Sequence, residues 1–312
     1  MSNRFLAHSG AKYPIIQAPM GWIARSQLAS AVCQAGGLGI IETSSGETET
    51  CKAEIEKMFT LTDAPFGVNL PILFLKDDEM MNWICESGVK FVTTSAGSPA
   101  KYVGPLKEAG ITVYHAVPTV EAAIRCAEAG VDGLVVEGGE GGGFKNPEEV
   151  STLVLLQAVR AAVDLPLVAA GGICDGRGMA AAFALGAEAV QMGTRFVSSA
   201  ESPVHDNYKG AIVDAPTTGT YVLNKKASPC LRALRTERTH KIHEEGVMPP
   251  DTFKNILDLY FGGDMEASVG LAGQTAGLID GVRPVADIIG DMVEEFHTIT
   301  RQMGQLAAAK GF

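Results

Sequence analysis

The chain has 312 residues, of which 46% are hydrophobic and 20% charged, a composition that excludes a disordered protein. Its net charge of −11 argues against nucleic acid or an anionic membrane as the main partner, so we expect a small-molecule substrate. The first residues lack the apolar core of a signal peptide, and no apolar run approaches the roughly 18 residues of a spanning helix. We therefore expect a cytoplasmic protein.

Apolar, often β-branched runs recur along the first two thirds of the chain, with helical patterns between them. The predicted strands cover residues 14–18, 38–41, 66–69, 90–94, 111–115, 133–137, 166–170 and 187–192. Amphipathic helices fit between most of them, for example over 119–129 and 150–163. Short apolar strands that alternate with helices indicate a buried parallel sheet. Eight such units predict an α/β fold of the TIM (β/α)8 barrel type.

The regular alternation of strand and helix patterns ends after Phe196. We expect three parts: the barrel over 1–199, a small helical cap or insertion over 200–275, and a C-terminal segment over 276–312 that closes the barrel. Within the last part, residues 284–309 have the pattern of one long amphipathic helix.

Two glycine-containing turns follow the last two predicted strands. Ala169-Ala-Gly-Gly172 comes first, and Met192-Gly-Thr-Arg-Phe196 follows a short Ala-rich helical stretch. In TIM barrels the loops after strands 7 and 8 offer backbone N–H groups to a phosphate, and glycine lets the backbone approach the anion closely. These turns predict a site for a phosphorylated cofactor or substrate.

The other predicted strand ends carry glycines, one asparagine and apolar groups, but few titratable side chains. Gln17–Trp22, Gly67–Leu70, His115–Pro118 and Glu137–Phe144 lie at these positions. Such a ring suits a flat, mostly apolar cofactor that brings its own reactivity. The sequence shows no metal cluster: the six cysteines form no CxxC pair, which indicates free thiols, and the pair His240 and His243 has no further ligand nearby, which indicates a solvated helix face.

Five motifs in this order resemble the nitronate monooxygenase family, which includes flavin-dependent enoyl-ACP reductases. They are Gln17–Met20, Phe66–Asn69, Glu137–Gly143, Ala169–Gly172 and Met192–Phe196, and the similarity returns near Gln274. The resemblance implies a TIM barrel with non-covalently bound FMN. By the same resemblance, Met20 and Gly21 line the isoalloxazine, Asn69 and Glu137 contact its polar edge or the ribityl chain, and the phosphate is held by Gly171, Gly172, Gly193 and Thr194. The other implied cofactor contacts are Ala18, Pro19, Gly142, Gly143 and Gln274.

The resemblance leaves two activities open. One is oxidation of alkyl nitronates with O2; the alternative is an NAD(P)H-dependent FMN reductase or dehydrogenase that acts on an enoyl thioester (of ACP or CoA) or a quinone. A third hypothesis, a barrel that binds a phosphorylated ligand without catalysis, predicts a colourless purified protein. An inosine-phosphate dehydrogenase would need a cysteine after the sixth strand, and residues 138–144 contain none. An oligomer is compatible with all of these.

The sequence departs from the family at Phe144, where a histidine is usual in the glycine-rich turn. A phenyl ring cannot accept a proton, so base-assisted oxidation of a neutral nitroalkane is disfavoured, whereas a nitronate is already an anion and hydride transfer from a nicotinamide needs no base. We consider Phe144 a candidate substrate contact. His115, at the end of the fifth strand, is a weaker candidate for the missing group than for a structural hydrogen-bonding role.

A basic cluster lies in the predicted cap, between residues 225 and 241. Arg232, Arg235 and Arg238 have the spacing of one helix face. A structural interpretation is a solvated surface helix whose arginines pair with glutamates. A functional hypothesis is that Arg232 and Arg235 contact the anionic part of a substrate, such as the phosphates of a CoA thioester or NADPH.

Overall fold

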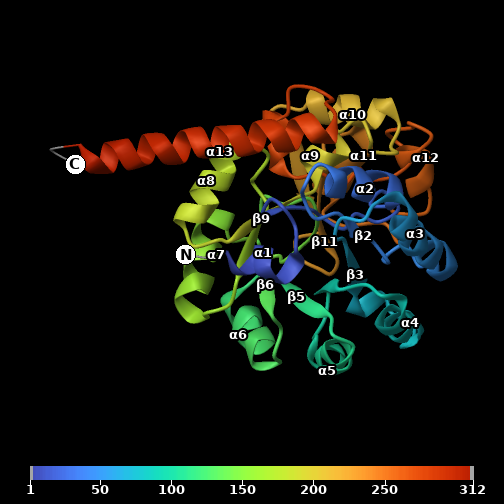
Figure 1. Cartoon of the computed structure of the whole chain (residues 1–312). Coiled ribbons are helices and arrows are strands. Elements are labelled where there is room, and N and C mark those ends of the chain that lie inside the picture. Colours follow the sequence, from blue (N-terminus) through green and yellow to red (C-terminus); the bar gives the residue numbers. More distant parts are fainter. Residues whose placement is uncertain (1–2, 310–312) are drawn as a thin grey trace.

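A computed structural model of the chain describes residues 3–309 (Figure 1); the outermost residues of the predicted first and last parts, 1–2 and 310–312, lie outside this range. Its centre is a sheet of eight parallel strands in the order β1-β9-β8-β6-β5-β4-β3-β2. A parallel bridge between Ile16 and Leu38 joins the two edges, so the sheet closes into the predicted TIM barrel.

Each predicted strand lies within one or two residues of an observed one. The strands are β1 (Ile15–Gln17), β2 (Ile40–Ile41), β3 (Gly67–Pro71), β4 (Phe91–Ser95), β5 (Thr112–Val117), β6 (Gly133–Glu137), β8 (Leu167–Ala170) and β9 (Ala189–Met192).

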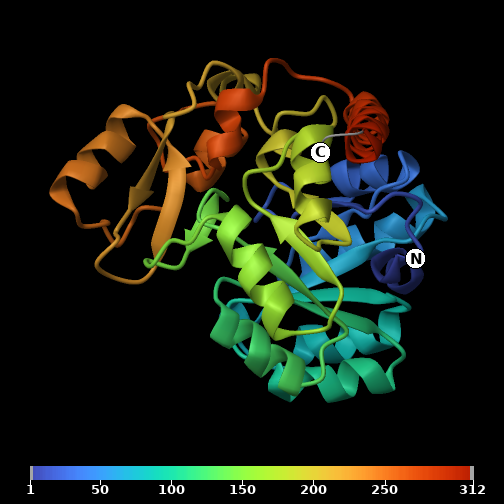
Figure 2. The same cartoon turned by 90° about the vertical axis from the view of Figure 1, so that its left-hand side faces the viewer.

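Helices surround the strands on the outside of the barrel (Figures 1 and 2). They are α2 (Ser26–Gln34), α3 (Thr48–Leu61), α4 (Glu79–Ser87), α5 (Ala100–Glu108), α6 (Val120–Glu128), α7 (Thr152–Ala162) and α8 (Gly176–Ala184). Side-chain caps start several of them: Thr119, Ser151 and Asp175 each accept a hydrogen bond from a backbone N–H of the first turn. The helices predicted over 119–129 and 150–163 are confirmed.

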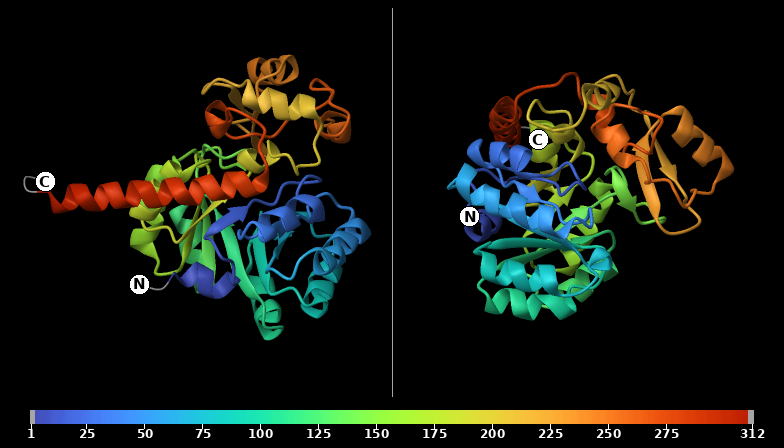
Figure 3. Two further views of the ribbon diagram at one scale, coloured as in Figure 1. Left: turned by 45° about the horizontal axis from the view of Figure 1, so that its top comes forward. Right: turned by 90° about the vertical axis from the view of Figure 1, so that its right-hand side faces the viewer.

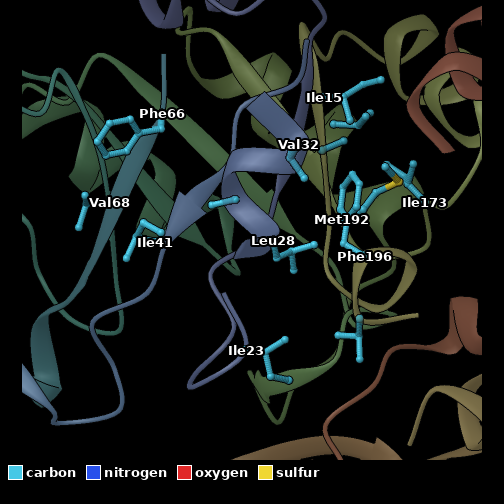
Figure 4. Close-up of a cluster of buried hydrophobic side chains, with 14 of the residues drawn as sticks. Ile15, Ile23, Leu28, Val32, Ile41, Phe66, Val68, Ile173, Met192 and Phe196 are labelled. Carbon is cyan, nitrogen blue, oxygen red and sulfur yellow. The ribbon is translucent and has the colours of Figure 1, made fainter. Parts of the chain in front are cut away.

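Side chains alternate along each strand between two hydrophobic layers. One layer fills the barrel interior and includes Ile16, Phe91 and Tyr114, with Phe5 of α1 (Arg4–Ser9) closing one end. The other lies between strands and helices and includes Leu28 and Val68 (Figure 4). The position of a residue in this alternation therefore decides whether it faces the interior, where a ligand can bind, or the helices.

The segment between residues 200 and 275 corrects the expectation of a purely helical cap. It contains α10 (Asp206–Val213), β10 (Thr220–Leu223), β11 (Cys230–Leu234), α11 (Glu237–Glu245) and α12 (Ile256–Tyr260). β10 and β11 form an antiparallel sheet with β7 (Gly143–Lys145), which comes from the loop after β6. This sheet forms a lobe beside the barrel (Figure 2). Its strands are short and one partner is distant in sequence, so local patterns did not reveal it.

The long helix predicted over 284–309 is α13 (Val285–Ala308). It packs against α8 and α2 and so takes the place of the eighth helix around the barrel. Figure 3 shows that its C-terminal part extends past the other elements. No helix among residues 3–309 combines the length and apolar character needed to cross a membrane. The boundaries between the three predicted parts stay a prediction.

Candidate active site

Asn69, Glu137 and Gln191, at the carboxyl ends of three strands, have their side chains on the interior face of the barrel. Asn69 on β3 is buried, and its amide nitrogen donates to the backbone oxygen of Thr93 at 3.1 Å and to its hydroxyl at 3.0 Å. The Ser95 hydroxyl donates to the amide oxygen of Asn69 at 3.3 Å. Both ends of the Asn69 amide therefore have partners, which fix its orientation toward the mouth of the barrel.

Glu137 and Lys145 form an ion pair at the end of β6. Glu137 ends β6 with its side chain on the interior face, since Val135, two residues earlier, belongs to the interior core. Lys145 reaches it from β7, and its side chain is only 3% exposed, against 31% for Glu137. β7 is itself held by pairing with β11. The sequence analysis missed Lys145; its position directly after Phe144 in a glycine-rich loop was the available signal.

The two glycine turns have the backbone geometry expected for an anion site. Gly171 and Gly172 have φ angles of +89° and +75°, a region that favours glycine. Among the described residues, the N–H of Gly172 has no acceptor from backbone or side chains. The turn leads into α8, whose first N–H groups already donate to Asp175 and Glu295, so the turn rather than the helix end offers its N–H to an anion.

The second turn, at Gly193, lies close to the loop after β1. A Cβ atom on Gly193 would be 3.6 Å from the Met20 sulfur and 3.7 Å from Ala18 Cβ. The preceding residue on the interior face, Gln191, has a buried side-chain oxygen without a hydrogen-bond partner among the described residues. A ligand hydroxyl or ring N–H would satisfy this acceptor, so the residues present fit a polar, phosphorylated cofactor.

A buried carboxylate shapes the loop that contains Ala18, Pro19, Met20 and Gly21. Glu42, fully buried after β2, accepts from the backbone N–H of Trp22 at 3.0 Å and pairs with Arg25 at 2.8 Å. Trp22 has a φ of +62°, an uncommon conformation for a bulky residue. Glu42 was also missed by the sequence analysis. It fixes the loop that the family resemblance assigns to the isoalloxazine.

The segment around Gln274 joins the site from the far end of the sequence. It lies in η2 (Gln274–Leu278), and its backbone N–H donates to Glu140 O at 2.9 Å. The N–H of Gly273 donates to the Thr194 hydroxyl at 2.9 Å, and a Cβ on Gly142 would lie 2.7 Å from the Ala272 backbone. The structure therefore brings Gly142, Thr194 and Gln274 close together, and their contact with a cofactor stays a prediction.

Glu140, in contrast, has a structural role. Its carboxylate accepts from the backbone N–H of Thr152 at 2.9 Å and from its hydroxyl at 2.9 Å. These bonds hold the glycine-rich loop against the start of α7.

Phe144 lies at the mouth of the barrel with 48% of its surface exposed. Its ring centre is 5.7 Å from that of Phe74, in η1 (Ile72–Phe74) after β3. Leu73 beside it is 77% exposed. Because β3 and β6 are separated by two other strands, this contact bridges part of the mouth. We name Leu73, Phe74 and Phe144 the apolar lip.

His115 faces away from this site. It follows Tyr114, an interior residue, and so points toward the helices, where its Nδ1 lies 2.7 Å from the Thr94 hydroxyl. Burial lowers the pKa of His115 to about 4. Its placement supports the structural role, and it does not replace a base at position 144.

The basic cluster is not one helix face, which corrects the expectation from its spacing. Residues 230–234 form the strand β11, which contains Arg232, whereas Arg238 lies in the helix α11. Arg232 is buried and donates to Gly139 O at 2.7 Å and to Glu149 at 2.5 Å, so it ties the lobe to the loop after β6. Arg235 stacks on Tyr221 at 4.3 Å.

Both arginines thus have intramolecular partners. The Tyr221 ring also stacks with that of His243, whose centre lies 4.3 Å away and which belongs to the exposed helix face that the spacing of His240 and His243 predicted. Arg235 remains a candidate for substrate contact only through its exposed edge.

Comparison with known proteins places this site in a family. The model of the nitronate monooxygenase family matches residues 3–86 and 76–295. The chain belongs to the nitronate monooxygenase family. It is 31% identical to a nitronate monooxygenase of Pseudomonas aeruginosa, over 95% of this chain and 100% of the relative.

Other relatives carry different names. A (3aS,4S,5R,7aS)-5-hydroxy-7a-methyl-1-oxo-octahydro-1H-indene-4-carboxyl-CoA dehydrogenase of Mycobacterium tuberculosis is 37% identical, over 75% of this chain and 66% of that protein. Among solved structures, FabK from Thermotoga maritima matches with a TM-score of 0.93 and 40% identity, covering 98% of this chain and 99% of FabK. A nitroalkane oxidase from Streptomyces ansochromogenes matches with a TM-score of 0.86 and 25% identity, over 94% and 98% of the two chains.

These relationships confirm the predicted family, the barrel and the oxidoreductase class. The family and its structural neighbours are flavin enzymes that act on small molecules. The residues of the site described above are the part of this chain that fits such a cofactor.

Proposed function

We propose that the chain binds FMN at the mouth of the barrel and oxidises alkyl nitronates with O2. The turns at Gly171–Gly172 and Gly193–Thr194 would hold the phosphate, and Gln191 the ribityl hydroxyls or ring N–H. Ala18, Pro19, Met20 and Gly21 would contact the ring from one side, and Asn69 and Glu137 its polar edge. Gly142, Gly143 and Gln274 would complete the cradle. When bound, the flavin supplies the two-electron redox chemistry.

One observation carries the choice of a nitronate over a neutral nitroalkane. Phe144 stands where the family resemblance implies a histidine, and His115 faces the helices, so neither supplies a base at the mouth. A nitronate has already lost the proton that a nitroalkane would have to give up. The buried ammonium of Lys145 would attract such an anion. The Glu137 carboxylate holds the lysine side chain in place.

A second candidate function is reduction of an enoyl thioester with NAD(P)H. The similarity to FabK and to a carboxyl-CoA dehydrogenase favours it. So does the apolar lip, which would cover the acyl part of a bulky substrate. In this reaction a base at position 144 is not needed either, because the hydride comes from the nicotinamide and the proton added at the α-carbon would come from water.

An anaerobic absorption experiment separates the two functions. The purified protein would be mixed with an alkyl nitronate, with NADH and with NADPH in separate runs. Bleaching of the flavin band by the nitronate alone supports the proposed oxidation. Rapid bleaching by a nicotinamide supports the reductase, and crotonyl-CoA then tests the thioester. A protein that purifies without flavin and does not take up added FMN contradicts both.

A further inference from the structure

Arg195 is a buried arginine whose hydrogen bonds go to neutral groups. It is the second residue of α9 (Thr194–Val197), and only 6% of its surface is exposed. Its guanidinium donates to the backbone oxygens of Ser198 at 3.1 Å and of Gly281 at 2.6 Å, whereas its Nε atom is buried without an acceptor. In the described part of the chain, no carboxylate lies within the 4.0 Å of an ion pair with it.

The charges around Arg195 do not compensate it. Burial lowers the pKa of its guanidinium, and the exposed carboxylate of Asp280 and the guanidinium of Arg283 act on this pKa in opposite directions. Burial also raises the pKa of the Cys174 thiol to about 12, so this nearby thiol is neutral at pH 7. A buried cation without an anionic partner is costly, and an anion bound beside it would offset that cost.

The position of Arg195 is next to both glycine turns. Its own helix starts directly after Gly193 in the second turn, and the strands that lead into the two turns, β8 and β9, pair with each other. Cys174, two residues after Gly172 in the first turn, is near enough for the arginine charge to oppose the rise in its pKa. The guanidinium therefore lies in the part of the molecule where the turns offer N–H groups to an anion.

A phosphate at these turns needs more positive charge than the backbone supplies. Backbone N–H groups carry only partial charges, and the first N–H groups of α8 already donate to the carboxylates of Asp175 and Glu295. The phosphate of FMN carries about two negative charges at pH 7. In surroundings shielded from water, a full charge acts over several ångströms, so Arg195 need not touch the phosphate to stabilise it.

We propose that Arg195 makes the site selective for a phosphorylated flavin: its buried guanidinium stabilises the phosphate through space, while the N–H groups of the two turns make the direct contacts. The inference rests on the proposed binding of FMN and is independent of the substrate that the flavin oxidises. Riboflavin has the same ring and ribityl chain as FMN but no phosphate. The charge of Arg195 should therefore favour FMN and leave riboflavin binding unchanged.

The test is the ratio of the dissociation constants of riboflavin and FMN, measured by fluorescence titration of the flavin-free protein. Arg195→Met and Arg195→Lys both remove the planar guanidinium, but only the lysine keeps the positive charge. We expect the methionine variant to lower the ratio at least about tenfold, with riboflavin affinity within about threefold of the wild type. The lysine variant should keep the ratio within about threefold.

The matched control is Arg160→Met. Arg160 also donates to two backbone oxygens, those of Val163 and Leu165, but in the loop that enters β8 at the end of the strand opposite the glycine turn. This variant should bind both flavins as the wild type does. Melting temperatures check that each variant is folded. If Arg195→Met does not fold, Arg195→Gln, which can still donate to one of the two oxygens, takes its place.

A structural role for Arg195 would give a different result. Equal losses of FMN and riboflavin affinity in the methionine variant would overturn the inference, and so would a lysine variant that loses selectivity to the same extent. A wild type that binds both flavins equally well would also overturn it, while flavin binding itself stands. A wild type that binds neither flavin contradicts the proposed function and this inference together.

Discussion

Lys145 forms an ion pair with Glu137 at the mouth of the barrel, and its side chain is almost completely buried although it comes from a surface loop. The pairing of β7 with β11 holds the lysine in this position. The lobe therefore contributes to the site indirectly, because it fixes the strand that delivers the lysine.

We expect Lys145→Met to affect both stability and anion binding. The change leaves the Glu137 carboxylate without its partner in a site that is about one third exposed, so unfolding free energy should fall by about 1–2 kcal/mol, less than for a fully buried pair. Loss of the cation should raise the dissociation constant of an alkyl nitronate about tenfold or more. Urea unfolding and spectral titration measure the two effects.

The control for this variant is Lys225→Met. Lys225 also pairs with a glutamate, Glu149, at 3.0 Å, but 56% of its side chain is exposed. Its removal should change stability by less than about 1 kcal/mol and leave nitronate binding unchanged. Equal effects of the two substitutions would show that Lys145 has no special role at the mouth.

Phe144→His should raise the turnover of neutral nitroalkanes. The ring at position 144 lies at the mouth, and an imidazole there can accept the proton that a nitroalkane must lose. General-base catalysis is worth roughly 100-fold or more, so kcat/KM should increase by at least tenfold if the geometry is only partly suitable. Phe144→Leu, which removes the aromatic ring without adding a base, should not produce this gain. An unchanged rate with FMN still bound would contradict the role of position 144.

The sequence predicted the features that follow from local patterns. The eight strands are short apolar runs between helices, and Asn69, Glu137 and the turn glycines come directly at strand ends. The sheet of the lobe was missed because β7 pairs with β11, whose residues lie 85 to 89 positions further along the chain. Glu42 and Lys145 were missed because their roles depend on contacts with residues 20 and 8 positions earlier in the chain.

One error of detail and one choice that the sequence left open have simple physical reasons. The three-residue spacing of Arg232, Arg235 and Arg238 fits a helix, but the β-branched and apolar partners that make residues 230–234 a strand lie elsewhere in the chain. His115 sits at a strand end, yet the alternation that places Tyr114 inside the barrel turns His115 outward. This second point was within reach of the sequence.

His115 should make stability depend on pH between about 4 and 6.5. Burial lowers its pKa to about 4 in the folded chain, against about 6.5 when unfolded, so the unfolded state binds more protons in this window. Stability from this residue is complete above pH 6.5 and is lost as the pH falls toward 4, by up to about 3 kcal/mol. Urea unfolding at several pH values measures the slope.

His115→Gln should flatten this slope while leaving nitronate turnover within about twofold, because the side chain faces the helices. His243→Gln, at an exposed position, serves as control and should leave the slope as it is in the wild type. A large loss of turnover in the His115 variant, with FMN still bound, would return His115 to the list of catalytic candidates.

Gly172→Ala should weaken FMN binding more than it weakens the fold. At a φ of +75° an alanine costs about 1 kcal/mol or more, and relief of that strain would turn the free N–H of residue 172 away from the phosphate. Space is not the obstacle, because the new Cβ would have only ordinary contacts of 3.6 Å with Glu140. We expect the dissociation constant of FMN to rise at least about tenfold, measured by fluorescence titration of the flavin-free protein.

Gly290→Ala is the matched control. This glycine lies in α13 with no atom near the added methyl group, so the change should leave FMN affinity unchanged and slightly raise helix stability. If both variants bind FMN as the wild type does, the Gly171–Gly172 turn is not the phosphate site.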